Sequence, residues 1–291
     1  MTGTRPRVAI AASNDFLDLD DGWPLLQEAM SAEGLAPSML VWDDPGADWS
    51  GVDLVVATYL WGYVTRRREF VNWAYRVASS ARLVNPAPVL EWGSDKSYLV
   101  DLAAEYVPIV PTIWVRAGER WRPPSGDYVI KPSVASGGMG AARYVNHGFQ
   151  MADRHVRQLL AAGQTVLIQP YQPAVDEEGE IALIYFGGNY SHAVRKEALL
   201  RSDVGVIDRL WERQMITRAV PRDDQSLVAD AAMRAVDHRV GPTGYARVDL
   251  VDDVEGRPVV LELEVVEPSL FLTHCPEAAA RFASHLRHLC D

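Results

Sequence analysis

The stretch Tyr245–Ser269, YARVDLVDDVEGRPVVLELEVVEPS, most constrains how this chain folds, because polar and apolar residues alternate along both of its halves. Such alternation predicts two half-buried strands, with Asp252–Arg257 as the turn between them. Arg247 and Asp249 then share one face, and Glu262 and Glu264 share one face of the second strand. The opposite, apolar face consists of Val248, Leu250, Leu261, Leu263 and Val265.

Pairing of these two strands would gather three carboxylates and one guanidinium on a patch about 10 Å across. Carboxylates this close repel one another, so either their pKa values rise or a divalent cation lies between them. Oxygen ligands on a rigid sheet suit Mg²⁺, which also accepts phosphate oxygens as ligands. A polar sheet face in contact with solvent is the simpler alternative.

The composition excludes several classes of protein. The chain has 291 residues, enough for two or three small domains, and a net charge of −11 that argues against a nucleic acid as partner. It has only two cysteines, no apolar segment long enough to cross a bilayer and no signal-peptide core, so we expect a cytoplasmic protein without a membrane partner. The sequence leaves open whether it is a monomer or a homo-oligomer.

The order of the predicted elements indicates an α/β fold. The first unit, residues 1–110, is expected to be an open α/β domain, and a second unit begins near Thr112. Residues 95–106 are expected to form a helix with Lys96 in its first turn. Asn85-Pro86-Ala87-Pro88 is expected to be a loop. The expected strands and helices of the first unit are Val8–Ala12, Trp23–Glu33, Met39–Trp42, Leu54–Thr58, Glu69–Ser80 and Arg82–Asn85.

A lysine and a glycine-rich loop in the second unit suggest contact with phosphate. Lys131 ends an apolar strand, where a buried ammonium group needs an anionic partner. The loop that follows contains Ser136, Gly137 and Gly138, whose backbone N–H groups could bind phosphate oxygens. The alternatives are a lysine that reaches the surface along its stem and an ordinary surface loop.

Two further groups of residues suit a nucleotide or an anionic substrate. Gln169 and Tyr171 belong to a proline-flanked hinge that could lie along a planar base. One of the acids that follow could hold ribose hydroxyls, and these acids are Asp176, Glu177, Glu178 and Glu180. Arg195 and Lys196 end a strand and could bind phosphate or a carboxylate. A solvated acidic loop and a surface basic pair are the alternatives. No Ser-His-Asp or Cys-His nucleophile and no zinc-ligand spacing is evident.

The order of these motifs resembles the ATP-grasp superfamily of carboxylate–amine ligases over most of the chain, from about Val8 to Phe271. The resemblance rests on a helix-start lysine, a strand-Lys-Pro, a glycine hairpin, a hinge, an acidic residue, Arg-Lys, Arg-x-Asp and Glu-x-Glu. It implies three α/β subdomains, with an N-terminal unit at residues 1–110, a central unit at 111–172 and a C-terminal unit at 173–291. ATP would bind between the central and C-terminal units.

The resemblance also implies a role for each candidate residue. Lys96 and Lys131 would bind the nucleotide, Ser136–Gly140 would cover its phosphates, Gln169 and Tyr171 would flank adenine, and Glu180 would lie near the ribose. Asp249, Glu262 and Glu264 would hold Mg²⁺, with two ions expected, and Arg247 would stabilise the transferring phosphoryl group, with Arg195 and Lys196 as further catalytic candidates. Glu264 departs from the asparagine that is usual there, which makes the site more negative.

The N-terminal half is similar to a narrower, glutathione-synthetase-like branch, on TYLWGYVTRRREF, LVNPAPVLEWGSDKSYL and VRKEALL. That branch includes the cyclo-ligase that forms D-cycloserine from O-ureido-D-serine. The implied function is ATP-dependent activation of a small, amino acid-like carboxylate as an acyl phosphate, which a nitrogen nucleophile attacks. Tyr59, Trp61 and Arg66 are candidates to line the substrate space, and Arg195 to hold its carboxylate. The alternatives are a kinase-like phosphotransferase and a nucleotide-binding regulator without turnover.

Overall fold

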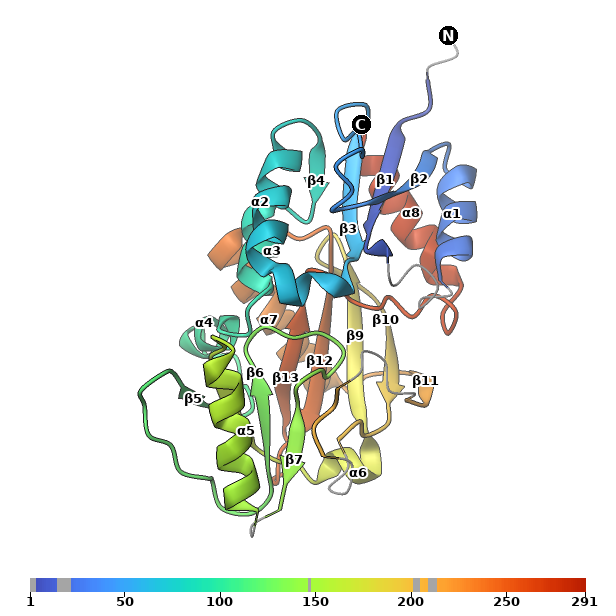
Figure 1. Cartoon of the computed structure of the whole chain (residues 1–291). Helices are drawn as coiled ribbons and strands as arrows, with labels where there is room; N and C mark the ends of the chain where they lie inside the picture. The colour runs from blue at the N-terminus through green and yellow to red at the C-terminus, as the bar shows by residue number, and fades with distance from the viewer. Residues whose placement is uncertain (1–3, 15–21, 146–147, 201–204, 209–213) are drawn as a thin grey trace.

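The structure is a computed structural model that describes residues 4–14, 22–145, 148–200, 205–208 and 214–291. It contains three sheets, each built from one segment of the chain, with helices packed against them (Figure 1). The predicted α/β fold is therefore confirmed. No helix within the described ranges combines the length and the apolar character that crossing a membrane requires.

The N-terminal sheet is parallel, with strand order β2-β1-β3-β4. Its central strands are short continuous apolar runs, and every residue of β3 is buried, as expected for a parallel sheet covered on both faces. Asn85-Pro86-Ala87-Pro88, expected to be a loop, instead leads into a helix, because proline is tolerated in the first turn, where no N–H donor is needed. The elements are β1 (Arg7–Ala12), α1 (Trp23–Ala32), β2 (Ala36–Val41), β3 (Leu54–Tyr59), η2 (Trp61–Arg66), α2 (Arg67–Ala78), β4 (Arg82–Val84), α3 (Ala87–Gly93) and α4 (Tyr98–Ala104).

The helix expected at residues 95–106 begins only at Tyr98, so Lys96 lies before it rather than in its first turn. The backbone N–H of Lys96 donates to the Ser133 carbonyl at 2.8 Å. This bond ties Lys96 to the central unit, which local helix signals could not reveal.

The central sheet is antiparallel, with order β5-β8-β6-β7, and α5 packs against one of its faces (Figure 1). Val156 on α5 meets Tyr128, Ile130 and Ile168 in a small separate core. The elements are β5 (Ile113–Val115), β6 (Tyr128–Pro132), β7 (Ala142–Tyr144), α5 (Phe149–Ala161) and β8 (Val166–Pro170).

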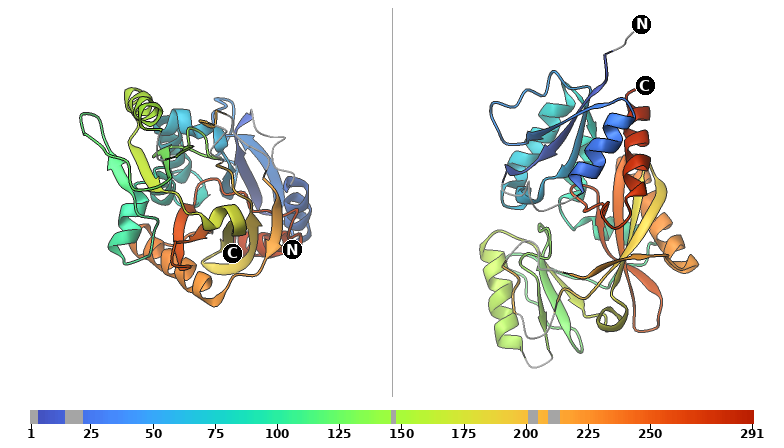
Figure 2. Two further views of the ribbon diagram at one scale, coloured as in Figure 1. Left: turned by 90° about the horizontal axis from the view of Figure 1, so that it is seen from below. Right: turned by 90° about the vertical axis from the view of Figure 1, so that its right-hand side faces the viewer.

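The C-terminal sheet is antiparallel, with order β11-β10-β9-β12-β13. The helix α7 covers one face, and the two further views show the central unit and the C-terminal sheet meeting on the other side (Figure 2). The elements are α6 (Ala174–Glu178), β9 (Glu180–Phe186), β10 (Asn189–Lys196), β11 (Ile216–Ala219), α7 (Asp223–Val240), β12 (Tyr245–Asp252), β13 (Pro258–Glu264) and α8 (Glu277–Leu289).

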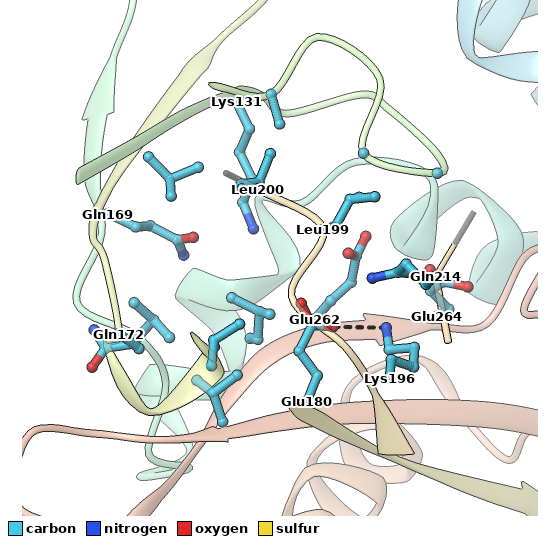
Figure 3. Close-up of a pocket in the computed structure, with 18 of the residues that line it drawn as sticks. Lys131, Gln169, Gln172, Glu180, Lys196, Leu199, Leu200, Gln214, Glu262 and Glu264 are labelled. Atoms are coloured by element: carbon cyan, nitrogen blue, oxygen red, sulfur yellow. Dashed lines mark ion pairs between the residues drawn. The ribbon is translucent and has the colours of Figure 1, made fainter. Parts of the chain in front are cut away.

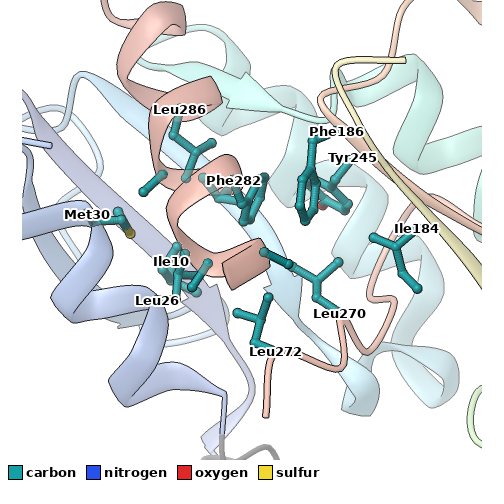
Figure 4. Close-up of a cluster of buried hydrophobic side chains, with 14 of the residues drawn as sticks. Ile10, Leu26, Met30, Ile184, Phe186, Tyr245, Leu270, Leu272, Phe282 and Leu286 are labelled. Atoms are coloured by element: carbon teal, nitrogen blue, oxygen red, sulfur yellow. The ribbon is translucent and has the colours of Figure 1, made fainter. Parts of the chain in front are cut away.

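The last helix joins the two ends of the chain. Phe282 and Leu286 on α8 pack between Leu26 of α1 and the C-terminal sheet (Figure 4). The Phe282 ring is stacked on Phe186, with centroids 4.5 Å apart. The N-terminal sheet and the C-terminal sheet therefore share one apolar core. The central unit packs against the body that these two sheets form.

Candidate active site

A pocket of about 410 Å³ lies between the central sheet and the C-terminal sheet (Figure 3). One end is mainly apolar, with Val110, Val129 and Leu261 in its wall, and the other end is lined by charged side chains. Lys131 points into the pocket from β6, opposite Glu262 on β13. A pocket of this size with an apolar end and a charged end suits a small ligand that has both a ring and anionic groups.

The predicted hairpin forms the charged floor of this pocket. Arg247 on β12 is opposite Glu264 on β13, and Asp249 is opposite Glu262, so the four side chains share one face as expected. Val248, Leu250 and Leu263 lie on the other face, in the core under α7. The alternation thus correctly assigned these seven residues to their faces.

Leu261 is an exception to the predicted alternation. The pairing passes from Asp249–Glu262 to Leu250–Val260, so Leu261 is the extra residue of a β-bulge. A bulge reverses the local alternation, and Leu261 therefore lines the pocket instead of joining the core on the other face. The expectation for this residue was wrong.

Every carboxylate on the floor has a cationic partner. Arg247 binds Asp249 through two bonds of 2.8 and 2.9 Å and Glu264 through one of 2.6 Å. Lys196 bridges Asp249 at 2.7 Å and Glu180 at 2.8 Å. The ammonium group of Lys196, the last residue of β10, therefore holds the Glu180 carboxylate in place (Figure 3).

Lys96 completes this arrangement from the N-terminal unit. Its ammonium group lies 3.0 Å from Glu262 and donates to the Ala135 carbonyl at 2.6 Å. Burial would by itself lower the pKa of Lys96, but the neighbouring Glu262 outweighs it and raises this pKa. Lys96 therefore links the floor of the pocket to the start of the glycine loop.

The pKa values of the acids on the floor are pushed apart. Burial alone would raise the pKa of Asp249, but Arg247 and Lys196 lower it to about 2. Burial raises the pKa of Glu264 to about 8 in spite of Arg247, since Glu262 and Asp249 add to the negative charge around it. The floor is thus a site where one more cation would be favourable.

The carboxylates of Asp249, Glu262 and Glu264 are suitable ligands for Mg²⁺, but they are not arranged around a common point. Within the described ranges, no three His, Cys, Asp or Glu side chains are grouped closely enough to hold a metal ion. The reason is visible in the ion pairs, since Asp249, Glu262 and Glu264 each turn toward a lysine or arginine. Buried carboxylate oxygens are the ligands that Mg²⁺ prefers, and phosphate oxygens usually complete its shell. The residues fit the ion once a phosphate is present.

Lys131 differs from the other lysines of the site. Its side chain is 9% exposed, and its ammonium group has no ion pair or hydrogen bond to any part of the chain that the structure describes. Burial lowers the pKa of Lys131 to about 8. A buried ammonium group without a partner is costly, which indicates an anionic ligand.

The glycine loop forms a wall of the pocket through Ser136, Gly137 and Gly138. Gly137 and Gly138 have φ angles of +59° and +75°, a region that L-residues rarely adopt. A Cβ on Gly138 would lie 2.5 Å from Leu199. The loop can therefore lie close to the pocket only because these positions are glycine.

The hinge lines the apolar end of the pocket with Gln169, Tyr171 and Gln172. The Tyr171 hydroxyl donates to Asp176 at 2.6 Å, and the Arg143 guanidinium lies 3.5 Å from the centre of its ring. These contacts fix the Tyr171 ring beside the pocket.

Five predicted residues lie outside the pocket wall. Asp249 and Lys96 pair with the wall residues Arg247 and Glu262, whereas Arg195, Arg66 and Tyr59 contact other groups. Arg195 donates to the Glu178 carbonyl, because the alternation of β10 directs it away from Lys196. Arg66 is paired with Asp43 and Glu69 on the surface. Tyr59 is buried next to Trp61, with the ring centroids 5.4 Å apart. Of the three residues predicted to line the substrate space, Tyr59, Trp61 and Arg66, Trp61 alone lines the pocket.

Sequence reasoning missed several residues of the wall, among them Gln214, Ser269 and Phe271. Phe271 has a φ of +50°, an unusual conformation for a bulky residue, and its ring lies 5.4 Å from the Arg247 guanidinium. No local pattern marks these positions. The only signal in the sequence for Ser269 and Phe271 was their place directly after the Glu-x-Glu strand.

Comparison with known proteins identifies relatives over nearly the whole chain. The family described as "D-cycloserine synthetase DcsG, N-terminal domain" matches residues 8–85. The cycloserine biosynthesis protein DcsG of Streptomyces lavendulae is 38% identical over 293 residues, which cover 96% of this chain and 97% of the relative.

Solved structures agree with these sequence matches. The crystal structure of D-cycloserine synthetase DcsG superimposes with a TM-score of 0.90 at 35% identity and covers 98% of this chain and 100% of that one. D-alanine–D-alanine ligase from Bacillus anthracis, complexed with ATP, shares the fold at a TM-score of 0.65 and 13% identity, covering 98% of this chain and 97% of that one. The chain belongs to the DcsG family and is an ATP-grasp enzyme, a carboxylate–amine ligase of the ADP-forming class.

Proposed function

We propose that this enzyme uses ATP to activate the carboxylate of O-ureido-D-serine and closes the ring of D-cycloserine. The relationship to D-cycloserine synthetase supports this choice of product. The observation that carries the proposal is the unpaired, buried Lys131, which faces three acids on the floor of the pocket beside the glycine loop. This arrangement suits an anionic ligand that brings metal ions with it.

The pocket accommodates ATP in one orientation. Adenine occupies the apolar end, beside Gln169 and Tyr171, and the phosphates lie toward Lys131. The loop residues Ser136, Gly137 and Gly138 offer backbone N–H groups to the phosphate oxygens. Glu180 lines the same pocket and would bind the ribose hydroxyls. Lys96 acts on the phosphates from the side of Glu262.

Asp249, Glu262 and Glu264 would hold Mg²⁺, and two ions fit the number of carboxylates on the floor. When bound, Mg²⁺ supplies charge that neutralises the β- and γ-phosphates during transfer. Arg247 lies between Asp249 and Glu264 and stabilises the charge of the transferring phosphoryl group. Lys196 contributes positive charge from the end of β10, while Arg195 acts only through the backbone of residue 178.

The substrate lies at the charged end of the pocket, against Trp61, Ser269 and Phe271. The backbone there is held firmly, since Trp61 Nε1 donates to the Glu267 carbonyl at 3.0 Å and His192 Nε2 lies 2.9 Å from the Leu270 carbonyl. A rigid wall places the small carboxylate close to the γ-phosphate, and positioning supplies much of the rate in phosphoryl transfer.

The ring closes when the nitrogen bonded to oxygen attacks the activated carboxyl carbon and phosphate leaves. D-cycloserine has one carbamoyl group fewer than O-ureido-D-serine, so this group must leave by hydrolysis, which consumes one water and gives carbon dioxide and ammonia. Both partners of the new C–N bond belong to one molecule. The protein therefore needs no nucleophile of its own.

The direct test is to incubate the protein with ATP, Mg²⁺ and O-ureido-D-serine and to quantify ADP, phosphate and D-cycloserine. We expect all three products in equal amounts, and Asp249→Asn should abolish phosphate release. The control Asp223→Asn changes an exposed residue at the start of α7 and should leave turnover intact. A phosphorylated substrate without free phosphate would instead indicate a kinase, and normal turnover in Asp249→Asn would refute the metal assignment.

A further inference from the structure

His192 is a buried histidine whose role the sequence motifs do not explain. It lies on β10 and is 4% exposed. His192 and Lys196 are four residues apart on this strand, so their side chains share one face of the sheet. On this face Lys196 meets Asp249 of the charged floor, whereas His192 contacts the segment that follows β13.

The ring of His192 makes one hydrogen bond at each of its nitrogens. Its Nε2 lies 2.9 Å from the Leu270 carbonyl, and its Nδ1 lies 3.0 Å from the Ser191 hydroxyl. Because a carbonyl oxygen can only accept, Nε2 carries the proton and Nδ1 accepts from Ser191. Burial lowers the pKa of His192 to about 4, so the ring is neutral at pH 7, with one donor and one acceptor.

Arg281 on α8 orients the Ser191 hydroxyl. Its Nε donates to this hydroxyl at 3.0 Å, and Nη2 donates to the Ser191 carbonyl at 3.3 Å. Since the hydroxyl oxygen already accepts from Arg281, its proton is available to His192 Nδ1. The hydrogen bonds therefore run in one direction, from Arg281 through Ser191 and His192 to the Leu270 carbonyl.

The segment that His192 contacts, residues 269–271, belongs to the substrate wall and has an unusual backbone. Ser269 and Phe271 line the pocket, while Leu270 between them packs its side chain into the core beside Phe186 (Figure 4). Phe271 has a φ of +50°, a conformation that persists only where the surrounding structure holds it.

The carbonyls on either side of Leu270 have donors of their own. The Ser269 carbonyl accepts from Arg247 at 3.4 Å. The Phe271 carbonyl accepts from the N–H groups of His274 and Cys275 at 3.0 and 3.1 Å. Within the described ranges, the middle carbonyl of the segment has the imidazole as its one donor.

We infer that His192 is a positioning residue for the amino acid substrate, because its hydrogen bond fixes residues 269–271 so that Phe271 keeps its place beside Arg247. This inference rests on the proposed binding of the substrate against this wall. Without the bond, a buried carbonyl lacks a donor, and the segment must move to satisfy it. The hinge and the glycine loop, which face ATP, are separate elements, so ATP should be affected much less.

The test is to measure the KM for O-ureido-D-serine and the KM for ATP separately in His192→Leu. We expect the KM for O-ureido-D-serine to rise about 10-fold or more, as loss of the donor to a buried carbonyl does, and the KM for ATP to change by less than about 2-fold. A smaller folded fraction would lower the rate but leave both KM values unchanged, so this split reports position rather than stability. Calorimetry of O-ureido-D-serine binding, with Mg²⁺ and a non-hydrolysable ATP analogue present, should show the same weakening without turnover.

Two amide variants separate the Leu270 contact from the Ser191 contact. The side-chain amide of glutamine reaches about as far as Nε2 of histidine, whereas that of asparagine reaches only about as far as Nδ1. His192→Gln can therefore still donate to the Leu270 carbonyl and should remain much closer to the wild type than His192→Leu. His192→Asn can meet only Ser191 and should resemble His192→Leu.

His238→Leu is the matched control, because His238 is exposed on α7 and contacts Glu105 at the surface. It should leave both KM values unchanged. An unchanged KM for O-ureido-D-serine in His192→Leu, an equal rise in both KM values, or equal behaviour of His192→Gln and His192→Asn would overturn the inference. If the wild type forms no ADP with this substrate, the proposed function fails and the inference falls with it. If the wild type is active and His192→Leu matches it, only the role of His192 fails.

Discussion

Replacing Lys131 by methionine should stabilise the folded protein and inactivate it. Lys131 is buried, has no partner in the described part of the chain, and has its pKa lowered from 10.5 to about 8. This difference of about 2.5 pKa units corresponds to about 3 kcal/mol, at about 1.4 kcal/mol per unit. Methionine is similar in shape and carries no charge, so its free energy of unfolding at pH 7 should be higher by up to about this amount.

The effect should depend on pH in a definite direction. Below about pH 8 Lys131 is protonated in both the folded and the unfolded chain, and the folded state bears the full cost of the buried charge. Between about pH 8 and 10.5 the folded state loses this proton first, so the wild type gains stability relative to the variant. The advantage of Lys131→Met should therefore shrink across this window.

Urea unfolding of the wild type and of Lys131→Met at pH 7 and pH 9.5 measures this difference in the free energy of unfolding. The slope m should be compared between the two proteins. Lys96→Met provides the matched control, because Lys96 is paired with Glu262 and its pKa is raised. Removing Lys96 should destabilise the protein, since it leaves a buried carboxylate without its cation.

The same variants should lose function together. Lys131→Met should release no phosphate from ATP, and ATP should raise the Tm of the wild type but not of the variant. A variant that is less stable than the wild type at pH 7 with an unchanged m would refute the reasoning about the buried charge. A variant that keeps full turnover would refute the placement of phosphate.

Two further predictions concern the acids of the floor and the junction between units. The pKa of Glu264 is raised from 4.5 to about 8, so the folded state releases this proton at a higher pH than the unfolded state does. The free energy of unfolding of the wild type should therefore fall as the pH rises from 4.5 to about 8. Urea titrations at about pH 5.5 and 8 should show a smaller fall for Glu264→Gln. An equal loss in both proteins would contradict the raised pKa. Asn85 is fully buried and bonds Tyr245 and Val265 carbonyls at 2.9 and 2.7 Å while accepting from the Gly244 N–H at 2.6 Å. Asn85→Ala should therefore reduce the free energy of unfolding by about 3 kcal/mol or more in chemical denaturation, and a loss below about 1 kcal/mol would show that these groups find other partners.

Patterns of short range predicted much of the fold and the site. The hairpin of β12 and β13 could be derived from alternation alone, because a period of two residues determines which side chains share a face. The glycine loop was recognised by composition, and its positive φ angles explain why glycine is needed there. The order of the motifs then indicated the superfamily, which the relatives confirm.

Other features depend on contacts between distant parts of the chain. The bulge at Leu261 reflects the pairing of two strands, and α3 forms although two prolines precede or open it. Arg195 and Lys196 looked equivalent in sequence, but the sheet directs one outward and the other to Asp249. Neither strand alone carries this information.

The chemistry of the site shows the same division. The sequence by itself determined which acids and bases share a strand face, since strand geometry is local, and it placed Lys131 before a glycine loop. Only the tertiary structure decided which cation meets which acid. Ion pairing and burial depend on distances in space, and those distances are determined by the packing of all three sheets together.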